Sequence, residues 1–173
     1  VVNDEVLQAD KIFINVGGRA SVPPLPGIHD IPFLTNSSMM DVDFLPEHLV
    51  IVGGSYIGLE FGQMYRRFGS EVTIVEMGPR LIGREDKDIC EAVRQILAAE
   101  GIQIRLNAKC ISLSKRDSRI AVGMSCSEGP PEVVGTHVLL AVGRTPNTSD
   151  LGLDRAGVAT DQRGYIVVDD QLQ

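Results

Sequence analysis

The residues whose types and spacing favour chemistry are a loop of small residues and a carboxylate that follows it. Gly53, Ser55 and Gly58 come directly after the apolar run 49–52 and open a helical pattern. A helix that begins at such a loop offers unpaired backbone N–H groups and a positive dipole end to a pyrophosphate. Glu76 ends the next apolar run, where a carboxylate can receive the adenosine ribose. The combination predicts a dinucleotide-binding βαβ unit.

The loop departs from the G-x-G-x-x-G pattern, because Ser55 occupies the place of the second glycine. That glycine lets the backbone approach the pyrophosphate closely. Serine is small, so its hydroxyl can turn aside or donate to a phosphate oxygen. The loop alone is also compatible with a tight strand-to-helix turn that binds nothing, but Glu76 at the end of the following strand favours the nucleotide site.

Glu76 also bears on the choice of cofactor. A carboxylate accepts hydrogen bonds from a ribose diol and repels the 2′-phosphate of NADP, so NAD is predicted. Arg80 and Arg84 are the opposing feature, since they are close enough in sequence to reach an adenosine phosphate. We expect Arg80 to be a solvated loop charge and Arg84 to support the loop.

The elements that must position these residues follow from hydrophobic periodicity. We expect helices over 39–45, 57–68 and 86–100, and strands over 9–16, 49–52, 71–75, 102–106, 110–114, 119–125, 132–134, 137–143 and 165–168. The two long helices are expected to turn Ile57, Phe61, Met64, Tyr65, Phe68, Ile89, Val93, Ile96 and Leu97 inward. The predicted fold class is α/β, with a parallel sheet, helices on one face and a three-stranded antiparallel meander on the other.

Composition excludes several classes of function. A net charge of −7 and a pI near 4.9 argue against a nucleic acid or an anionic membrane as the main partner. No apolar run is long enough to span a bilayer and no signal pattern opens the sequence, so we expect a cytoplasmic protein. The three cysteines, Cys90, Cys110 and Cys126, are widely spaced and are interpreted as free thiols, and His29, His48 and His137 show no metal-ligand spacing.

Four stretches carry a resemblance to a known family. They are GGSYIGLEFG at 53–62, TIVEMGPRLI at 73–82, REDKDI at 84–89 and the long run from Ala141 to Asp170. They resemble the pyridine-nucleotide-disulfide oxidoreductases, which include lipoamide dehydrogenase, glutathione reductase and mercuric reductase. The resemblance implies a Rossmann-like FAD/NAD(P)-binding fold and a division into the end of an FAD domain with its linker (1–46), an NAD-binding domain (47–147) and a return segment (148–173). Ser55 is similar to the residue found in mercuric-reductase-like members.

The resemblance also implies roles for individual residues. Gly53, Gly54 and Ser55 would line the pyrophosphate, and Tyr56 would match a ring at the nicotinamide site, although a packed aromatic is the plainer alternative. The full implied set of cofactor contacts is Val16, Gly17, Gly18, Gly53, Gly54, Ser55, Tyr56, Ile57, Gly58, Glu60, Glu76, Met77, Cys110, Val142 and Gly143. Within it, Val16 to Gly18 would lie near FAD, Cys110 near the adenine with its side chain free of any role, and Gly143 near the nicotinamide. No catalytic residue and no metal ligand are expected here, with Glu60 supporting the flavin site by pairing with a lysine elsewhere.

The implied activity of the intact enzyme is hydride transfer from NADH to FAD and then to a redox disulfide, in a homodimer. The chain looks like the middle of such an enzyme, so we expect it to bind NAD(H) without turning over. An NADH oxidase or peroxidase, a ferredoxin-reductase-like flavoenzyme, and a non-catalytic nucleotide-binding module are the alternatives. A cysteine pair, a single cysteine, or no FAD motif in upstream sequence would distinguish them.

Overall fold

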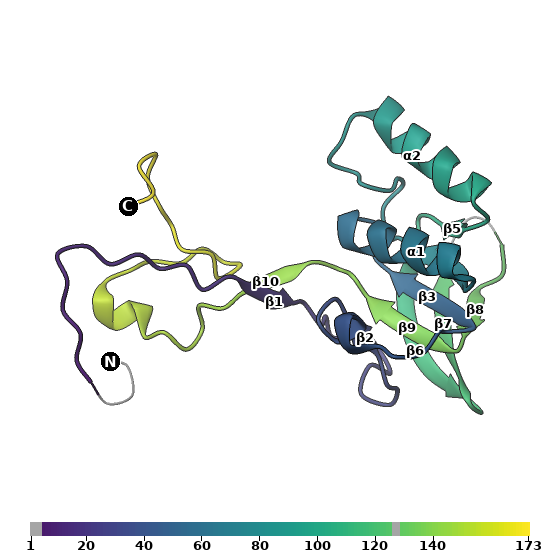
Figure 1. The fold of residues 1–173 in the computed structure, drawn as a ribbon, viewed down its shortest axis with the longest axis horizontal. Coiled ribbons are helices and arrows are strands. Elements are labelled where there is room, and N and C mark those ends of the chain that lie inside the picture. The colour runs from purple at the N-terminus through teal and green to yellow at the C-terminus, as the bar shows by residue number, and fades with distance from the viewer. Residues whose placement is uncertain (1–4, 126–128) are drawn as a thin grey trace. The chain divides into compact units, whose positions relative to one another are not determined.

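The structure, a computed structural model, describes residues 5–125 and 129–173. Cys126, interpreted above as a free thiol, lies outside the described residues. Contacts divide the chain into unit 1, Val1–Arg19 with Thr145–Gln173, and unit 2, Ala20–Arg144. The elements, labelled in Figure 1, are β1 (Gly18–Ala20), β2 (Leu34–Thr35), η1 (Ser38–Asp41), β3 (His48–Val52), α1 (Tyr56–Phe68), β4 (Glu71–Val75), α2 (Lys87–Ala99), β5 (Gln103–Arg105), β6 (Lys109–Arg116), β7 (Arg119–Ser125), β8 (Glu132–Gly135), β9 (His137–Leu140), β10 (Arg144–Pro146) and η2 (Leu153–Ala156). The sequence-based domain boundaries stay a prediction.

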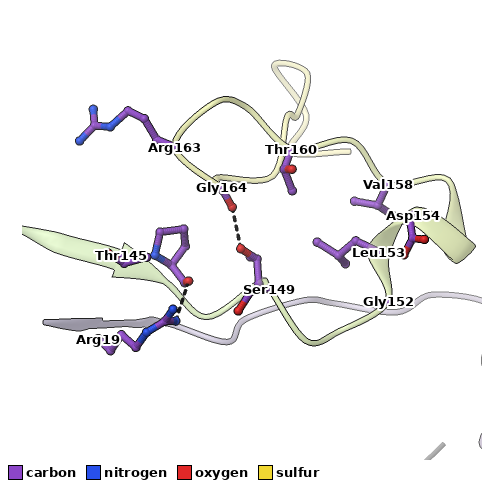
Figure 2. Close-up of a pocket in the computed structure, with 12 residues that line it drawn as sticks. Arg19, Thr145, Ser149, Gly152, Leu153, Asp154, Val158, Thr160, Arg163 and Gly164 are labelled. Carbon is purple, nitrogen blue, oxygen red and sulfur yellow. Dashed lines mark hydrogen bonds between the residues drawn. The ribbon is translucent and has the colours of Figure 1, made fainter. Parts of the chain in front are cut away.

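Unit 1 is built from two separate stretches of chain and holds the 3-10 helix η2. Arg19 donates Nη1 to the Pro146 carbonyl at 3.1 Å, and Thr148 Oγ1 donates to the Gly164 carbonyl at 2.7 Å. These contacts border a pocket of about 350 Å³, shown in Figure 2. The residues that line the pocket are Arg19, Thr145, Pro146, Thr148, Ser149, Gly152, Leu153, Asp154, Val158, Thr160, Arg163 and Gly164. None of them belongs to the predicted set of cofactor contacts.

Unit 2 is organised on a five-stranded parallel sheet with the order β2-β9-β3-β4-β5. In the register of its centre, Val52 pairs with both Val75 and Leu140. Every residue of β3 is buried, as expected of a central strand covered on both faces. Because all five strands are parallel, their carboxyl ends meet at one edge, where open α/β sheets bind ligands.

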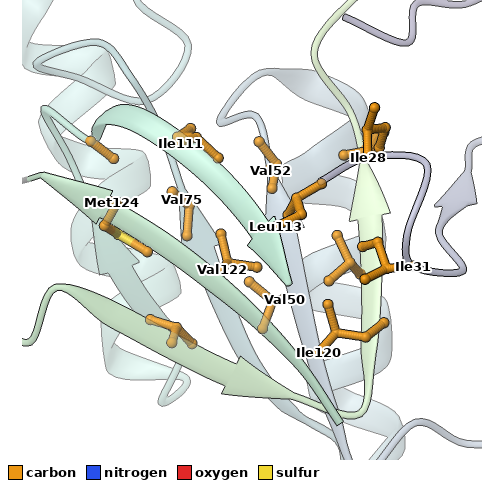
Figure 3. Close-up of a cluster of buried hydrophobic side chains, with 14 residues drawn as sticks. Ile28, Ile31, Val50, Val52, Val75, Ile111, Leu113, Ile120, Val122 and Met124 are labelled. Carbon is orange, nitrogen blue, oxygen red and sulfur yellow. The ribbon is translucent and has the colours of Figure 1, made fainter. Parts of the chain in front are cut away.

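Two apolar clusters cover the two faces of this sheet. Val50 and Val52 face the antiparallel sheet β6-β7-β8 and pack with Ile111, Leu113 and Val122, as Figure 3 shows. Leu49 and Ile51 point the other way and pack with side chains from α1 and α2. The alternation follows from the two-residue period of a strand. The predicted fold class is confirmed, with helices on one face and a three-stranded antiparallel meander on the other.

The inward faces of the two long helices are confirmed in part, because Ile57, Phe61, Tyr65, Val93 and Leu97 pack in the cluster between the helices and the sheet as predicted. Met64 and Phe68 of α1 were predicted wrongly. They are 38% and 62% exposed, because the helix buries Gly58, Leu59 and Gly62 beside the predicted Tyr65. Glycine at these positions brings the helix backbone close to the sheet, which rotates the bulkier residues outward. In α2 the buried residues are Cys90 and Leu97, whereas Ile89 and Ile96 are about half exposed. Cys90, Val93 and Leu97 form an equally regular helical stripe.

Three shorter elements were also predicted wrongly. Residues 9–16 form no strand, and their side chains are exposed, because they pair with no other strand among the described residues. The predicted strand 165–168 is reduced to one bridge between Thr160 and Ile166. The predicted helix 39–45 is only the single turn of η1, because the chain becomes extended at Val42.

His48 opens β3 and is buried at the amino end of the sheet. Its backbone N–H donates to Thr136 Oγ1 at 3.1 Å, and its ring Nε2 lies 2.9 Å from Thr73 Oγ1. Burial lowers the pKa of His48 below its ordinary value of 6.5, against the opposing effect of Glu71, whose Oε2 is 3.7 Å from Nδ1. The folded protein therefore favours the neutral ring.

This burial predicts a specific dependence of stability on pH. The unfolded chain takes up a proton on His48 more readily than the folded chain does. The contribution of the neutral His48 ring to the free energy of unfolding is therefore complete above about pH 6.5, and it is lost as pH falls through the lower pKa of the folded state. His48→Asn should flatten this fall, measured as the urea midpoint between about pH 7.5 and about pH 5.5. His29→Asn, at an exposed position, is the matched control. An unchanged pH profile in His48→Asn would contradict the assignment.

Candidate functional site

The loop after β3 and the segment after β9 meet at the carboxyl edge of the parallel sheet. Gly53 has a φ of +115°, and a Cβ on it would lie 2.3 Å from the Ala141 carbonyl oxygen. Only glycine allows this approach without strain. The contact brings Val142 and Gly143, which directly follow Ala141, beside the loop. Val142 is partly exposed, and Gly143 has a φ of +123°.

Helix α1 begins immediately above this loop. A Cβ on Gly58 would lie 2.2 Å from the Gly53 carbonyl oxygen, so the third glycine of the motif lets the helix start close to the strand end. The Leu59 N–H is the first to be satisfied, by the Ser55 carbonyl. Within the described residues, the N–H groups of Ser55, Tyr56, Ile57 and Gly58 find no acceptor, and no side chain caps the helix. A helix terminus with such unpaired N–H groups is suited to an anion.

Ser55 fits its position without strain. Its φ of −105° and ψ of −177° are extended backbone, and the residue is exposed. The departure from the glycine pattern is therefore tolerated by the protein backbone itself. Its hydroxyl makes no capping hydrogen bond, so it can turn toward a ligand.

Glu76 is fixed beside the loop by two backbone hydrogen bonds. Its Oε2 accepts from the Gly54 N–H and its Oε1 from the Gly78 N–H, each at 2.6 Å. A carboxylate has about four lone-pair sites, so each oxygen can still accept from a hydroxyl. Gly78 was not anticipated from the sequence, because its contribution is a backbone N–H. The carboxylate is thus held in place before any ligand arrives.

The connection between β4 and α2, residues 76–86, packs on the loop. The Ile82 N–H donates to the Gly54 carbonyl at 2.8 Å, and Leu81 Cδ2 would lie 2.7 Å from a Cβ on Gly54. At the start of α1, the Tyr56 hydroxyl donates a hydrogen bond to the Glu85 carboxylate. Leu81, Ile82 and Glu85 were not predicted, since the residue types of a loop do not indicate which distant groups they contact.

The other predicted contacts are placed as follows. Met77 is 61% exposed directly after Glu76, and Cys110 is exposed with a φ of +52° at a bulge in β6. The segment leading to Cys110 runs beside Glu76, whose carbonyl accepts from the Ala108 N–H at 3.0 Å. Ile57 is half-buried and Glu60 is exposed on α1.

Val16, Gly17 and Gly18 belong to unit 1. The Asn147 side chain donates to the Val16 carbonyl at 3.1 Å, and the Asn147 N–H donates to the Gly17 carbonyl at 3.1 Å. These bonds join the two stretches of unit 1. The predicted role of the three residues near FAD stays a prediction.

In residues 5–125 and 129–173, no group of three or more histidine, cysteine, aspartate or glutamate side chains is arranged to hold a metal ion. None of the helices in the same ranges has the length and apolar content needed to cross a bilayer.

The parallel sheet, the glycine turn and the helix that starts from it are the features of a Rossmann-like α/β fold. Residues 1–173 match the family described as pyridine nucleotide-disulphide oxidoreductase. The chain belongs to the pyridine nucleotide-disulphide oxidoreductase family, and the resemblance seen in the sequence is confirmed. The roles given to individual residues stay predictions.

The chain is similar to several named members of this family. Over 167 residues the chain is 39% identical to the probable pyridine nucleotide-disulfide oxidoreductase RclA of Escherichia coli (strain K12), covering 96% of this chain and 37% of RclA. Over 167 residues it is 34% identical to a mercuric reductase of Streptomyces lividans, covering 96% and 35%. The structure of RclA from Escherichia coli, titled an HOCl-induced flavoprotein disulfide reductase, superposes with a TM-score of 0.85 at 37% identity, covering 96% and 38%. The chain thus spans a little over a third of the length of these relatives.

Proposed function

We propose that unit 2 is the NAD(H)-binding domain of a pyridine-nucleotide-disulfide oxidoreductase. The observation that carries the proposal is the pairing of four free N–H groups at the start of α1 with a carboxylate already fixed beside them. The N–H groups are suited to a pyrophosphate, and the carboxylate is suited to a ribose diol. The two chemistries occur together in a dinucleotide.

The residues present fit such a ligand. Three glycines each lie against another part of the protein: Gly53 against Ala141, Gly54 against Leu81, and Gly58 against Gly53. Ser55 is the exposed point of the loop, so it is the residue that would lie against the pyrophosphate. Glu76 would accept hydrogen bonds from the adenosine ribose, with Met77 and Cys110 toward the adenine. Tyr56, Ile57, Val142 and Gly143 would lie toward the nicotinamide.

In the intact protein, we propose that bound NADH supplies a hydride to FAD, which then reduces a disulfide. This chain's part is to bind and orient the dinucleotide, with Glu60 supporting the flavin side and Val16 to Gly18 lying near FAD. A homodimer in the cytoplasm is proposed with it. Because the chain spans a little over a third of its relatives, we propose that it binds NAD(H) by itself without completing the reaction.

The proposal is tested by titrating NADH and NADPH against the purified chain and following nucleotide fluorescence or heat. We expect saturable binding of NADH and weaker binding of NADPH, because the Glu76 carboxylate repels a 2′-phosphate. Absence of saturable binding of either nucleotide would sink the proposal. A tenfold preference for NADPH would sink the role of Glu76 alone.

Glu76→Ala should weaken NADH binding by about 1–2 kcal/mol, because a charged hydrogen bond to the ribose is lost. It also removes the acceptor of the Gly54 and Gly78 N–H groups, so the loop itself loses a constraint. The measurement is the NADH dissociation constant, with urea unfolding as a check on the fold. Glu91→Ala, an exposed carboxylate on α2, is the control and should leave binding unchanged.

A further inference from the structure

Ile82 lies on the connection between β4 and α2 with its backbone in the left-handed region, at a φ of +41°. A β-branched residue is strained there, and such strain persists only where the surrounding structure imposes it. We propose that Ile82 is a positioning residue of the nucleotide site, which holds the Gly54 carbonyl and thereby aims the Ser55 N–H at the pyrophosphate. The inference rests on the proposed function, because it concerns the same loop.

Three sets of contacts hold Ile82 in this conformation. Its side chain is 7% exposed and packs in the cluster between the sheet and the helices. Its N–H donates to the Gly54 carbonyl at 2.8 Å. Its carbonyl accepts from the Glu85 N–H at 2.9 Å and from the Cys90 thiol at 3.5 Å. Because the side chain and both backbone groups are engaged, the residue can relax to an ordinary conformation only by breaking several contacts.

The hydrogen bond from Ile82 fixes the direction of one peptide unit in the loop. The Gly54 carbonyl and the Ser55 N–H belong to the same planar unit, which is trans. In a trans peptide these two groups point in opposite directions, so a carbonyl directed at Ile82 directs the Ser55 N–H away from the connection. That N–H is the first of the four free donors at the start of α1. Ile82 therefore sets the direction of a donor that it does not itself contact.

The same connection holds the other side of Gly54. The Gly54 N–H donates to Glu76 Oε2 at 2.6 Å, and a Cβ added to Gly54 would lie 2.7 Å from Leu81 Cδ2. Leu81 is 1% exposed, so this part of the connection is anchored in the core. Residues 76–82 thus carry the carboxylate proposed for the ribose and also orient a donor proposed for the pyrophosphate. One short segment sets the spacing between the two halves of the site.

Two substitutions separate the backbone conformation of Ile82 from its packing. Ile82→Ala removes the buried side chain that holds the residue and keeps a Cβ, which disfavours a positive φ. Ile82→Gly removes the same side chain but adopts a positive φ without strain. Ile102→Ala is the matched control, because Ile102 is 4% exposed in the same cluster and directly precedes β5, at the amino ends of the strands.

Hydrogen exchange tests the conformation without any ligand. In the unaltered chain, the Ile82 N–H should be protected by its hydrogen bond to the Gly54 carbonyl. We expect Ile82→Ala to lose protection at position 82, whereas Ile82→Gly and Ile102→Ala should retain it. Full protection at position 82 of Ile82→Ala would overturn the proposal, because the contact with Gly54 would then not depend on Ile82.

NADH titration tests the consequence for the site. Ile82→Ala should raise the NADH dissociation constant about three- to tenfold, because one donor to the pyrophosphate is misdirected. Ile82→Gly should recover most of the lost affinity although it lacks the same side chain, and Ile102→Ala should bind as the unaltered chain does. Equal weakening in Ile82→Ala and Ile82→Gly would show that packing alone matters and would overturn the proposal.

Urea unfolding of each variant selects conditions in which the protein is folded. If Ile82→Ala does not fold, Ile82→Val carries the same test, because it keeps the β-branched strain and loses only one methylene of packing. It should show a smaller rise in the NADH dissociation constant and a partial loss of protection at position 82. Unchanged values of both quantities in Ile82→Val would then overturn the proposal.

The outcomes separate this inference from the proposed function. If the unaltered chain binds NADH and Ile82→Ala binds it equally well, the role of Ile82 is overturned and the NAD(H) site stands. If the unaltered chain binds no NADH, the proposed function fails and the aim at a pyrophosphate fails with it. Hydrogen exchange still decides in that case whether Ile82 holds the Gly54 carbonyl.

Discussion

Gly58→Ala is expected to abolish measurable NADH binding and to lower the free energy of unfolding by about 1–3 kcal/mol. The new Cβ would lie 2.2 Å from the Gly53 carbonyl oxygen and 3.3 Å from the Gly53 carbonyl carbon. Neither atom can move away easily, because the Gly53 N–H donates to the Val75 carbonyl at 2.8 Å and Gly53 itself abuts Ala141. The start of α1 must therefore shift, and the four free N–H groups lose their common direction.

The measurements are the NADH dissociation constant and the urea midpoint of the same preparation. Gly83→Ala is the control, because the nearest atom to its new Cβ is the Arg80 carbonyl oxygen at 3.7 Å, an ordinary contact. Gly83→Ala should change neither the NADH dissociation constant nor the urea midpoint appreciably. Retention of normal NADH affinity by Gly58→Ala would show that the helix start does not carry the ligand.

Ile51→Ala is expected to destabilise the protein by about 2–5 kcal/mol, enough to unfold a marginal domain. Ile51 is fully buried at the centre of β3 and packs in the cluster between the sheet and the two helices. Its side chain lies directly beneath α1: a Cβ added to Gly58 would be 3.3 Å from Ile51 Cγ2, and a Cβ added to Gly62 would be 3.3 Å from Ile51 Cδ1. Truncation leaves a cavity that the helix can fill only by moving.

Urea unfolding measures the loss, with Ile51→Val as a graded variant expected to cost about 0.5–1.5 kcal/mol. Ile96→Ala supplies the contrast, since Ile96 has the same chemistry but is 55% exposed on α2. Its effect should stay within about 0.5 kcal/mol. A large loss from Ile96→Ala would instead support the inward face that periodicity predicted.

The sequence predicts the order of elements here better than it predicts which side chains face inward. The runs 49–52 and 71–75 are apolar enough to identify central strands, and Gly69 and Gly101 mark where the helices end. Met64 and Phe68 were placed on the inward face wrongly because Gly58 and Gly62 pack by lacking side chains, which a hydrophobic pattern does not register. Ile89 and Ile96 satisfy the helical period as well as Cys90 does, so periodicity alone could not choose among them.

The candidate site was also predictable only in part. Gly53, Gly58 and Glu76 are recognised because the turn and the carboxylate impose residue types at fixed spacing. Gly78, Ile82 and Glu85 act through backbone groups or through a partner distant in sequence, so their types carry no local signal. Strand 9–16 was wrong for a different reason, because a strand requires a partner as well as a suitable composition.

The continuity of unit 2 has a practical consequence. Unit 2 is one uninterrupted stretch, and near its two ends the Ser21 N–H donates to the Gly143 carbonyl at 3.0 Å. Entry and exit of the chain are thus side by side, which is the geometry of a module that can be inserted into, or removed from, a host protein. Residues 20–144 could accordingly be transplanted as a cassette on two short linkers, or circularly permuted, without stretching the sheet.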